Sequence, residues 1–312
     1  MLVNSNMTTI DKAKPLVPFL FMGCWNEDDS PRVSVAKAIM KNPIETLVLG
    51  GDNVYPQKLR IGNATDFTRV YSQKTLMNGV HMLHGKDIYA ALGNHNVGGP
   101  MLKLQSSLTE WTMPNRYYSV NFTDYSLVVI DSNLIDDAET FDNMNKWLLE
   151  TINKLKVERR KYYYVQHDPF ISFGKKKITV FPKLTEILGV LANYPPIAIL
   201  CADTHNYQKG TLQIGDVIIQ QYVVGTGGAH PDYAKGKNGD SHTTMDITYT
   251  MESHIPGYGY LEIKPESTKF IKVENWRPFE GKAGKHSENK IYRKTYKFIH
   301  RRNKKSKKRI RK

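Results

Sequence analysis

Residues 44–55 read Ile-Glu-Thr-Leu-Val-Leu-Gly-Gly-Asp-Asn-Val-Tyr, and they carry the strongest structural signal in the chain. A short apolar run ends in two glycines and is followed by Asp52 and Tyr55, which predicts a buried strand whose carboxyl end carries polar groups. Three more clusters follow apolar runs in the same way: Leu92-Gly93-Asn94-His95, Gln166-His167-Asp168-Pro169 and Asp203-Thr204-His205-Asn206. The carboxyl ends of parallel strands meet at one edge of an α/β sheet, so the four clusters predict one shared site.

The apolar patterns along the whole chain predict an α/β fold. Strands are expected near residues 16–23, 45–51, 87–92, 117–122, 126–132, 161–167, 196–202, 217–225, 258–264 and 269–275. Helices are expected near 31–41, 66–79, 143–157 and 183–193, with Asp142 or Asn143 as the cap of the third. Early strands alternate with helices and later strands follow one another, which predicts two packed mixed β-sheets flanked by helices in a four-layer sandwich. Residues 231–254, rich in Gly, His and Thr, are expected to form a long surface loop.

Composition limits the class of protein. The chain has 312 residues, of which 40% are apolar, enough to bury one large core. We expect no transmembrane segment, because no run approaches the roughly 18 to 20 apolar residues that a membrane helix needs. Residues 1–14 lack the apolar segment of a signal peptide, and two cysteines, Cys24 and Cys201, cannot build a disulfide framework. These features predict an intracellular protein, cytoplasmic or nuclear.

The quoted clusters resemble the calcineurin-like metallophosphoesterases, and within them the purple (tartrate-resistant) acid phosphatase branch. The resemblance runs from Phe19 to Gly228. Besides the clusters above, it includes Met113-Pro114-Asn115-Arg116-Tyr117-Tyr118-Ser119, whose Pro-x-Arg-Tyr-Tyr segment is particular to that branch, and the strand Val128-Val129-Ile130-Asp131. It implies two divalent or trivalent metal ions, with iron, zinc or manganese as candidates.

The same resemblance assigns ligands to two metal positions. Asp52 looks like the carboxylate that bridges both ions. Tyr55 looks like a phenolate that selects trivalent iron at the first position, with His205 beside it. Asn94 and His167 look like ligands of the second position. Two cations about 3.5–4 Å apart activate water and neutralise the oxygens of a phosphoryl group, which is why such sites hydrolyse phosphate esters.

The resemblance also implies a reaction. A metal-bound hydroxide would hydrolyse a phosphomonoester substrate, and His95 would orient the phosphate and protonate the leaving alkoxide. An imidazole suits that role because its unperturbed pKa lies near neutrality. Asp52 and Asn94 complete the set of expected catalytic residues.

The first family motif is degenerate in this chain. It reads Gly23-Cys24-Trp25-Asn26, so Cys24 stands where the family has a metal-binding Asp. Ala202 and Asp203 replace the Gly and the first His of a Gly-His-x-His motif, and Asn96 replaces an acid. Asp203 keeps an oxygen donor, so a hard cation should still be held there. Cys24 is open to two interpretations: a soft ligand for zinc or ferrous iron, or a small buried packing residue that leaves the first position one ligand short.

The net charge of +14 lies in the C-terminal segment. Residues 282–312 hold 15 Lys and Arg and one acid, whereas residues 1–281 hold 29 of each sign. Such a segment is expected to be a disordered interaction tail that follows a phosphoesterase domain at residues 1–281. Nucleic acid is its leading candidate partner; a nuclear localisation signal, anionic lipid and a simple solubility tail remain alternatives. The alternative function is therefore a catalytically impaired phosphoesterase fold that binds polyanions through its tail.

Overall fold

The computed structural model describes residues 9–26, 30–55, 75–95, 99–174, 178–180 and 184–273. Its larger sheet has nine strands and is mixed, because some neighbouring strands pair in parallel and others pair antiparallel. In spatial order these are β1 (Thr9–Asp11), β5 (Tyr118–Asn121), β6 (Ser126–Val129), β7 (Tyr162–Val165), β10 (Ala198–Cys201), β12 (Val217–Val224), β11 (Tyr207–Ile214), β14 (Ile247–Ile255) and β13 (Ser241–Thr244).

The second sheet has five strands and is also mixed. Its order is β16 (Ser267–Lys272), β15 (Gly259–Lys264), β2 (Phe19–Met22), β3 (Thr46–Leu49) and β4 (Asp87–Ala90). Strands β2, β3 and β4 pair in parallel, and β15 pairs antiparallel with β2. All ten predicted strands are present in these two sheets, which confirms the predicted α/β architecture.

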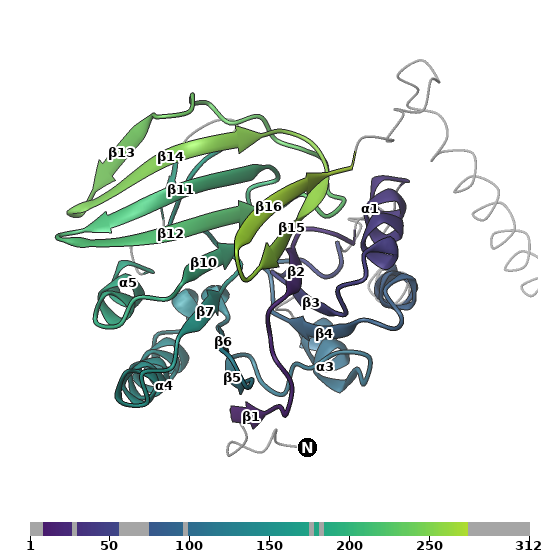
Figure 1. Cartoon of the computed structure of the whole chain (residues 1–312), viewed down its shortest axis with the longest axis horizontal. Helices are drawn as coiled ribbons and strands as arrows, with labels where there is room; N and C mark the ends of the chain where they lie inside the picture. Colours follow the sequence, from purple (N-terminus) through teal and green to yellow (C-terminus); the bar gives the residue numbers. More distant parts are fainter. Residues whose placement is uncertain are drawn as a thin grey trace, which may run out of the picture. The chain divides into compact units, whose positions relative to one another are not determined.

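Helices flank the sheets. Helices α4 (Ala138–Val157) and α5 (Leu184–Ala192) lie beside β7 and β10, whereas α1 (Ser30–Lys41) lies beside β2 and β3 (Figure 1). Residues 75–82 are also helical, and α3 (Gly99–Ser107) follows β4. A short 3-10 helix, η1 (Ser132–Asp136), precedes α4. None of the helices in the described ranges has the length and apolar character needed to cross a membrane.

Two apolar cores lie on opposite faces of the larger sheet. In β7, Tyr163 and Val165 belong to the core shared with the second sheet, whereas Tyr162 and Tyr164 belong to the core under α4 and α5. Successive residues of a strand point to opposite faces, so a strand that is buried on both sides reads as a continuous apolar run. This explains why the central strands could be recognised from sequence.

The cap of α4 differs from the prediction. The helix begins at Ala138, and its N-cap is Asp137, whose side chain accepts hydrogen bonds from the backbone and hydroxyl of Thr140. Asp142 and Asn143 therefore lie inside the helix and do not cap it. The 3-10 turn η1 ends just before Asp137, and sequence periodicity alone did not show that a separate turn precedes the helix.

The surface loop predicted at 231–254 is wrong in its second half. Strands β13 and β14 form a hairpin there, with Met245 and Asp246 in its turn at positive φ. Residues Ile247, Tyr249 and Met251 alternate with less buried residues, the period expected of a half-buried strand. The many Thr and His residues of this segment were interpreted as loop residues, but β-branched Thr suits a strand.

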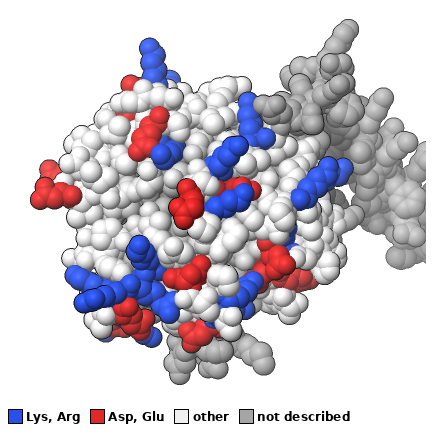
Figure 2. All heavy atoms as spheres, in the orientation of Figure 1, with Lys and Arg blue, Asp and Glu red and all other residues white. Residues whose placement is uncertain are grey.

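Other elements lie beyond what the sequence predicted. Strands β1 and β11, helix α3 and the small sheet of β8 (Ile171–Phe173) and β9 (Ile178–Val180) were not expected. The predicted helix at 66–79 lies only partly within the described residues, and the predicted tail at 282–312 lies outside them. Both signs of charge are mixed over the described face of the molecule (Figure 2), in line with the equal counts of acids and bases in residues 1–281.

Candidate metal centre

The predicted site residues gather where the two sheets meet. Strands β2, β3 and β4 of the five-stranded sheet and β7 and β10 of the larger sheet each end at this place. Two hydrogen bonds join the two sheets there: Gly23 N donates to Val224 O at 2.9 Å, and the side-chain Nδ1 atom of His167 donates to Gly50 O at 2.8 Å. The residues that follow the strand ends are Cys24, Asp52, Asn94, His95, His167, Asp203 and His205.

Two glycines allow this close approach. Gly51 has φ +94°, and a Cβ atom at this position would lie 2.6 Å from the His167 Nδ1 atom and 2.7 Å from Leu92 O. A Cβ atom at Gly93 would lie 2.2 Å from Asp52 N. Residues with side chains would therefore push the strand ends apart.

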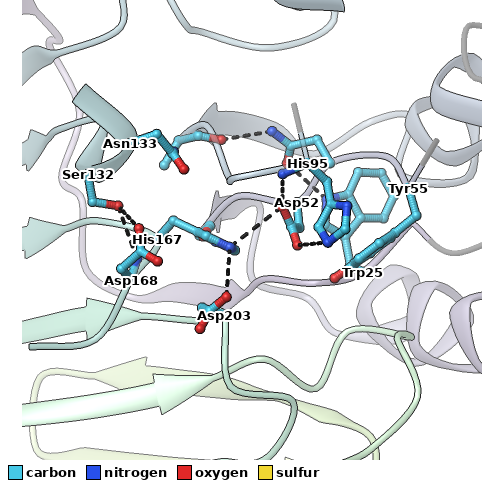
Figure 3. Close-up of polar contacts among 12 residues, drawn as sticks. Trp25, Asp52, Tyr55, His95, Ser132, Asn133, His167, Asp168 and Asp203 are labelled. Carbon is cyan, nitrogen blue, oxygen red and sulfur yellow. Dashed lines mark hydrogen bonds and ion pairs between the residues drawn. The ribbon is translucent and has the colours of Figure 1, made fainter. Parts of the chain in front are cut away.

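Asp52 lies at the middle of the site and is almost fully buried. Its Oδ1 atom accepts a hydrogen bond from His95 N at 3.1 Å and lies 3.5 Å from His167 Nε2. Its Oδ2 atom lies 4.0 Å from His95 Nε2. Figure 3 shows Asp52 between His95 on one side and His167 with Asp203 on the other. The two carboxylate oxygens of Asp52 therefore face different histidines.

His167, expected as a ligand of the second position, has a fully buried side chain. Its Nε2 atom lies 3.5 Å from Asp52 Oδ1 and 3.8 Å from Asp203 Oδ1, and it makes no hydrogen bond within the described part of the chain. Burial lowers the pKa of His167, but the carboxylates of Asp52, Asp168 and Asp203 outweigh burial and raise that pKa to about 9. The carboxylates thus attract positive charge to this point, either a proton on the imidazole or a cation.

The residues expected at the first position lie close to Cys24. One ligand atom each from Cys24, Asp52 and His205 lie within 4.8 Å of one another, and the Tyr55 hydroxyl lies 3.2 Å from His205 Nε2. Burial, followed by the charges of Asp52 and Asp203, raises the pKa of the Cys24 thiol. Burial also raises the pKa of Tyr55, with further contributions from Cys24 and Asp52. Without a cation, both groups therefore keep their protons.

The two histidines share a hydrogen-bond pattern that suits metal binding. Nδ1 of His167 donates to Gly50 O, and Nδ1 of His205 donates to His230 O at 2.9 Å. A carbonyl can only accept, so each Nδ1 carries a hydrogen, and Nε2 is the ring nitrogen that each histidine would offer to a cation in place of a proton. Histidine ligands are commonly oriented by such a bond from the second ring nitrogen. With the carboxylates beside them, these side chains fit a pair of cations.

Three strand-end residues adopt a backbone conformation that is uncommon for side chains other than glycine. Cys24, Asp52 and Asp203 have φ values of 50°, 52° and 42°. Left-handed conformations of non-glycine residues carry a conformational penalty of about 1–3 kcal/mol and occur often at functional sites. The three φ values are similar, so the local backbone geometry of Asp52 is repeated at Cys24 and Asp203, two of the positions where the expected motif is altered.

His95 and Asn94 lie at the rim of the site. Both residues are exposed, in the turn after β4. The His95 ring packs against the Tyr55 ring with centroids 4.8 Å apart, and its side chain is 46% exposed. His95 is therefore accessible to a molecule that approaches from solvent, while its backbone N–H is fixed by Asp52.

A buried polar network supports the first position, and sequence reasoning did not identify it. Asn53 accepts a hydrogen bond from the Trp25 indole at 3.0 Å and donates to Ala91 O at 2.8 Å. Asn26 donates to Asn53 O at 2.8 Å and accepts from the Arg32 guanidinium at 2.7 Å. Asn26 is thus used in the network and does not replace the missing acid as a ligand. The available signal was the polar character of residues 26 and 53 directly after buried strands.

A second network lies behind His167. Asp168 is buried; it accepts a hydrogen bond from the Ser132 hydroxyl at 2.5 Å, and its own N–H donates to that hydroxyl at 3.1 Å. Next to Ser132, Asp131 is fully buried and pairs with Arg116, which belongs to the Pro-x-Arg-Tyr-Tyr segment. Arg116 therefore stabilises the segment beside the site through Asp131 and makes no direct contact with the expected ligands among the interactions described.

The two cysteines lie in different apolar clusters. Cys24 packs with Ala202 and Ala229, whereas Cys201 belongs to the core under α4 and α5 and its thiol lies 3.3 Å from Tyr222 O. Adjacent residues of β10 and the turn after it point to opposite sides, which separates Cys201 from the site.

Comparison with known proteins supports the fold. No family model matches the chain, and no curated protein matches it. Similar solved structures include GAP50, described as the anchor in the inner membrane complex of Plasmodium, with 14% identity, TM-score 0.57, and coverage of 84% of this chain and 86% of that one. Purple acid phosphatase PPD1 from yellow lupin (Lupinus luteus) is 12% identical with TM-score 0.60, and the match covers 85% of this chain and 53% of the lupin protein. PhoD is 11% identical with TM-score 0.51, covering 88% and 75%.

At these identities the comparison concerns the fold. The chain has a metallophosphoesterase-like fold, with two mixed sheets flanked by helices.

Proposed function

We propose that this protein is a metal-dependent phosphoesterase that hydrolyses a phosphomonoester at the site around Asp52. The observation that carries the proposal is the buried Nε2 atom of His167. This atom faces two carboxylates without a hydrogen bond among the described residues, and its Nδ1 is tethered to Gly50 O. A buried polar atom without a hydrogen bond is uncommon and requires an explanation, which a cation held between this nitrogen and the two carboxylates provides.

The donors divide between two cation positions that share Asp52. His167, Asp203 and Asn94 would hold the second cation, through imidazole nitrogen, carboxylate oxygen and amide oxygen. His205 and Tyr55 would serve the first position. Cations held there would lower the pKa of a water molecule and neutralise phosphoryl oxygens, the chemistry on which such hydrolysis depends. Iron, zinc and manganese all suit nitrogen and oxygen donors of this kind.

The residues of the chain would contribute substrate binding and proton transfer. His95 is half-exposed at the rim and lies 4.0 Å from Asp52 Oδ2, so its Nε2 is available to a phosphate above the site. We infer that His95 binds a phosphoryl oxygen and donates a proton to the leaving alkoxide. Asp52 keeps His95 in place through the backbone N–H bond of 3.1 Å. Proton transfer by a positioned side chain contributes roughly 10²–10⁴-fold to rate.

The test is turnover of para-nitrophenyl phosphate by the full-length protein with added Mn²⁺, Zn²⁺ or Fe²⁺, from pH 5 to 8. We expect turnover that depends on the cation, and Asp52→Asn should abolish it. His95→Ala should lower kcat by roughly 10²–10⁴-fold while leaving cation binding intact. Ser241→Ala is a matched control, because Ser241 lies on edge strand β13 and its hydroxyl contacts only the Thr250 hydroxyl among the hydrogen bonds found. Absence of turnover with every cation would exclude the proposal.

A second function is favoured by the sequence and by one relative. Nine of the last twelve residues are Lys or Arg, and the same fold occurs in GAP50, which is described as an anchor. In this alternative the phosphoesterase fold is a scaffold, and residues 282–312 bind nucleic acid through its phosphates. Replacing the nine cations of residues 301–312 by Ser in the full chain should then flatten the dependence of binding on salt. An unchanged salt slope would exclude this function.

A further inference from the structure

We propose that Cys24 is a metal ligand, and that it makes the first position a sulfur-containing zinc site rather than the trivalent-iron site that Tyr55 suggests by resemblance. The inference deepens the proposed function and rests on it, because it names the cation of one of the two positions. It concerns the residue at which the chain departs most from the expected motif. Cys24 has two open interpretations, ligand or packing residue, and four observations favour the first.

The first observation is the distance. The Cys24 Sγ atom, an Asp52 carboxylate oxygen and a His205 ring nitrogen lie within 4.8 Å of one another. Atoms that share one tetrahedral cation, with bonds of about 2.0–2.3 Å, lie roughly 3–4 Å apart, so small side-chain movements bring the three onto one ion. The Tyr55 hydroxyl, 3.2 Å from His205 Nε2, provides a fourth donor.

The second observation is the backbone of Cys24. Its N–H donates to Gly51 O at 3.0 Å, and its carbonyl accepts from Ala229 N at 2.9 Å. Both peptide groups are fixed, so the direction of the Cα–Cβ bond is also fixed. The φ value of 50° nearly equals that of Asp52, 52°. Left-handed backbone suits Asp and Asn better than other side chains, so a Cys that only packed against Ala202 and Ala229 would carry this conformational penalty for a small apolar contact.

The third observation is the orientation of His205. Its Nδ1–H donates to His230 O at 2.9 Å, which leaves the Nε2 lone pair directed toward Tyr55 and the first position. Zinc accepts thiolate, imidazole and carboxylate ligands together, whereas harder cations prefer oxygen donors. The sulfur, nitrogen and oxygen atoms of Cys24, His205 and Asp52 match zinc.

The fourth observation is the contrast with the second position. There the donors are the Asp52 and Asp203 carboxylates and the His167 imidazole. Among the described residues, the cluster of potential ligands that contains a thiol is that of Cys24 with Asp52 and His205, and the other thiol, Cys201, lies in a different core. The ligand atoms of the two positions therefore differ in softness, and zinc should prefer the position that contains the Cys24 sulfur. On binding, the Cys24 S–H bond breaks, a Zn–S bond forms, the proton passes to solvent, and zinc remains divalent.

The experiment is zinc X-ray absorption on the full-length protein, stripped of metal and reloaded with zinc. We expect a sulfur neighbour at about 2.3 Å in the wild type. Cys201→Ser is the matched control, since it removes the other buried thiol, and it should keep that sulfur neighbour. Cys24→Ser should lose the sulfur neighbour and should weaken zinc binding. Loss of a residue that only hydrogen-bonds a metal ligand lowers metal affinity roughly 10–100-fold, so loss of Cys24 as a direct ligand should lower zinc affinity by at least that factor. Cys24→Asp should restore binding through oxygen and shift preference from zinc toward manganese.

A zinc spectrum without sulfur in the wild type would overturn the inference, as would a sulfur neighbour that persists in Cys24→Ser. Should Cys24→Ser fail to fold, comparison of the wild type with Cys201→Ser still decides whether sulfur is bound and which thiol supplies it. Turnover of para-nitrophenyl phosphate in the same samples separates the two proposals. Turnover with zinc bound only by nitrogen and oxygen would sink this inference alone; sulfur-bound zinc without turnover would sink the proposed function alone.

Discussion

Replacement of Gly51 by Ala tests the close approach of the two sheets on which the site depends. Gly51 precedes Asp52 and has φ +94°. A methyl group there would lie 2.6 Å from the His167 ring and 2.7 Å from the carbonyl of Leu92. Neither neighbour can move freely, because the ring is tethered to Gly50 O and the carbonyl belongs to the backbone.

Two terms set the size of the effect. Positive φ in a residue with a Cβ atom costs about 1–2 kcal/mol. Overpacking of a close-packed interior costs about 1–3 kcal/mol more. The sum, about 2–5 kcal/mol, is a large part of the roughly 5–15 kcal/mol by which folded domains are stable.

Gly239 allows the two terms to be separated. Its φ is also +94°, but a Cβ atom there would meet nothing within 4 Å, so Gly239→Ala carries only the conformational term. Urea unfolding in EDTA should give a larger loss for Gly51→Ala than for Gly239→Ala, by about 1–3 kcal/mol, with unchanged slope. Gly85→Ala, at φ +96° and also in open space, should behave like Gly239→Ala. Equal losses in all three variants would refute the close contact between the sheets.

Three further outcomes are expected. Arg116→Ala removes the cation that pairs with the fully buried Asp131 and should lower the free energy of unfolding in urea by about 2 kcal/mol. This loss is smaller than the roughly 3–5 kcal/mol typical of broken buried pairs, because the Arg116 side chain is 27% exposed. An unchanged urea midpoint would contradict the role of this pair. Manganese at a hundred times its Kd for the second position should add about 2.7 kcal/mol to the unfolding free energy. His167→Ala should remove most of that gain, as measured by thermal unfolding, and an undiminished gain in the variant would exclude His167 as a ligand of manganese. Hydrogen bonds from Thr140 lower the pKa of Asp137, so its stabilising effect is present above the unfolded-state pKa and is lost as pH falls through the lower folded-state pKa. The difference in urea midpoint between wild type and Asp137→Ala should therefore shrink below about pH 4, and a constant difference would show that the cap does not depend on the charge.

The sequence was sufficient to predict the strands that build the site. Strands β3, β7 and β10 are buried on both faces, and each is followed by a polar cluster, so their position and their shared edge followed from pattern alone. Asp52, His167 and Asp203 follow these strands, so their proximity in space could be predicted from the shared position of the strand ends.

Elements at the periphery were less accessible to prediction. Strands β13 and β14 are polar on alternate positions, and their Thr, Ser and His residues resemble a loop when considered one by one. Strand β8 is bound partly by side chains: the Gln208 amide pairs with both backbone groups of Phe173, and the Gln221 amide pairs with Phe170 N and Ile171 O. Side-chain amides from residues distant in sequence make hydrogen bonds that a neighbouring strand would otherwise make. The local sequence pattern around β8 gives no sign of these bonds, so this strand could not be predicted from it.

The left-handed backbone at Cys24 has a consequence for how the chemistry of the centre can change. The peptide groups on both sides are already fixed in the conformation that an aspartate favours, so exchanging sulfur for oxygen requires a new side chain and no new scaffold. β-branched residues are disfavoured in that conformation, so few alternatives are open. The choice of metal at this centre can therefore change without a change in the fold, and replacement of a single codon would be enough to alter it.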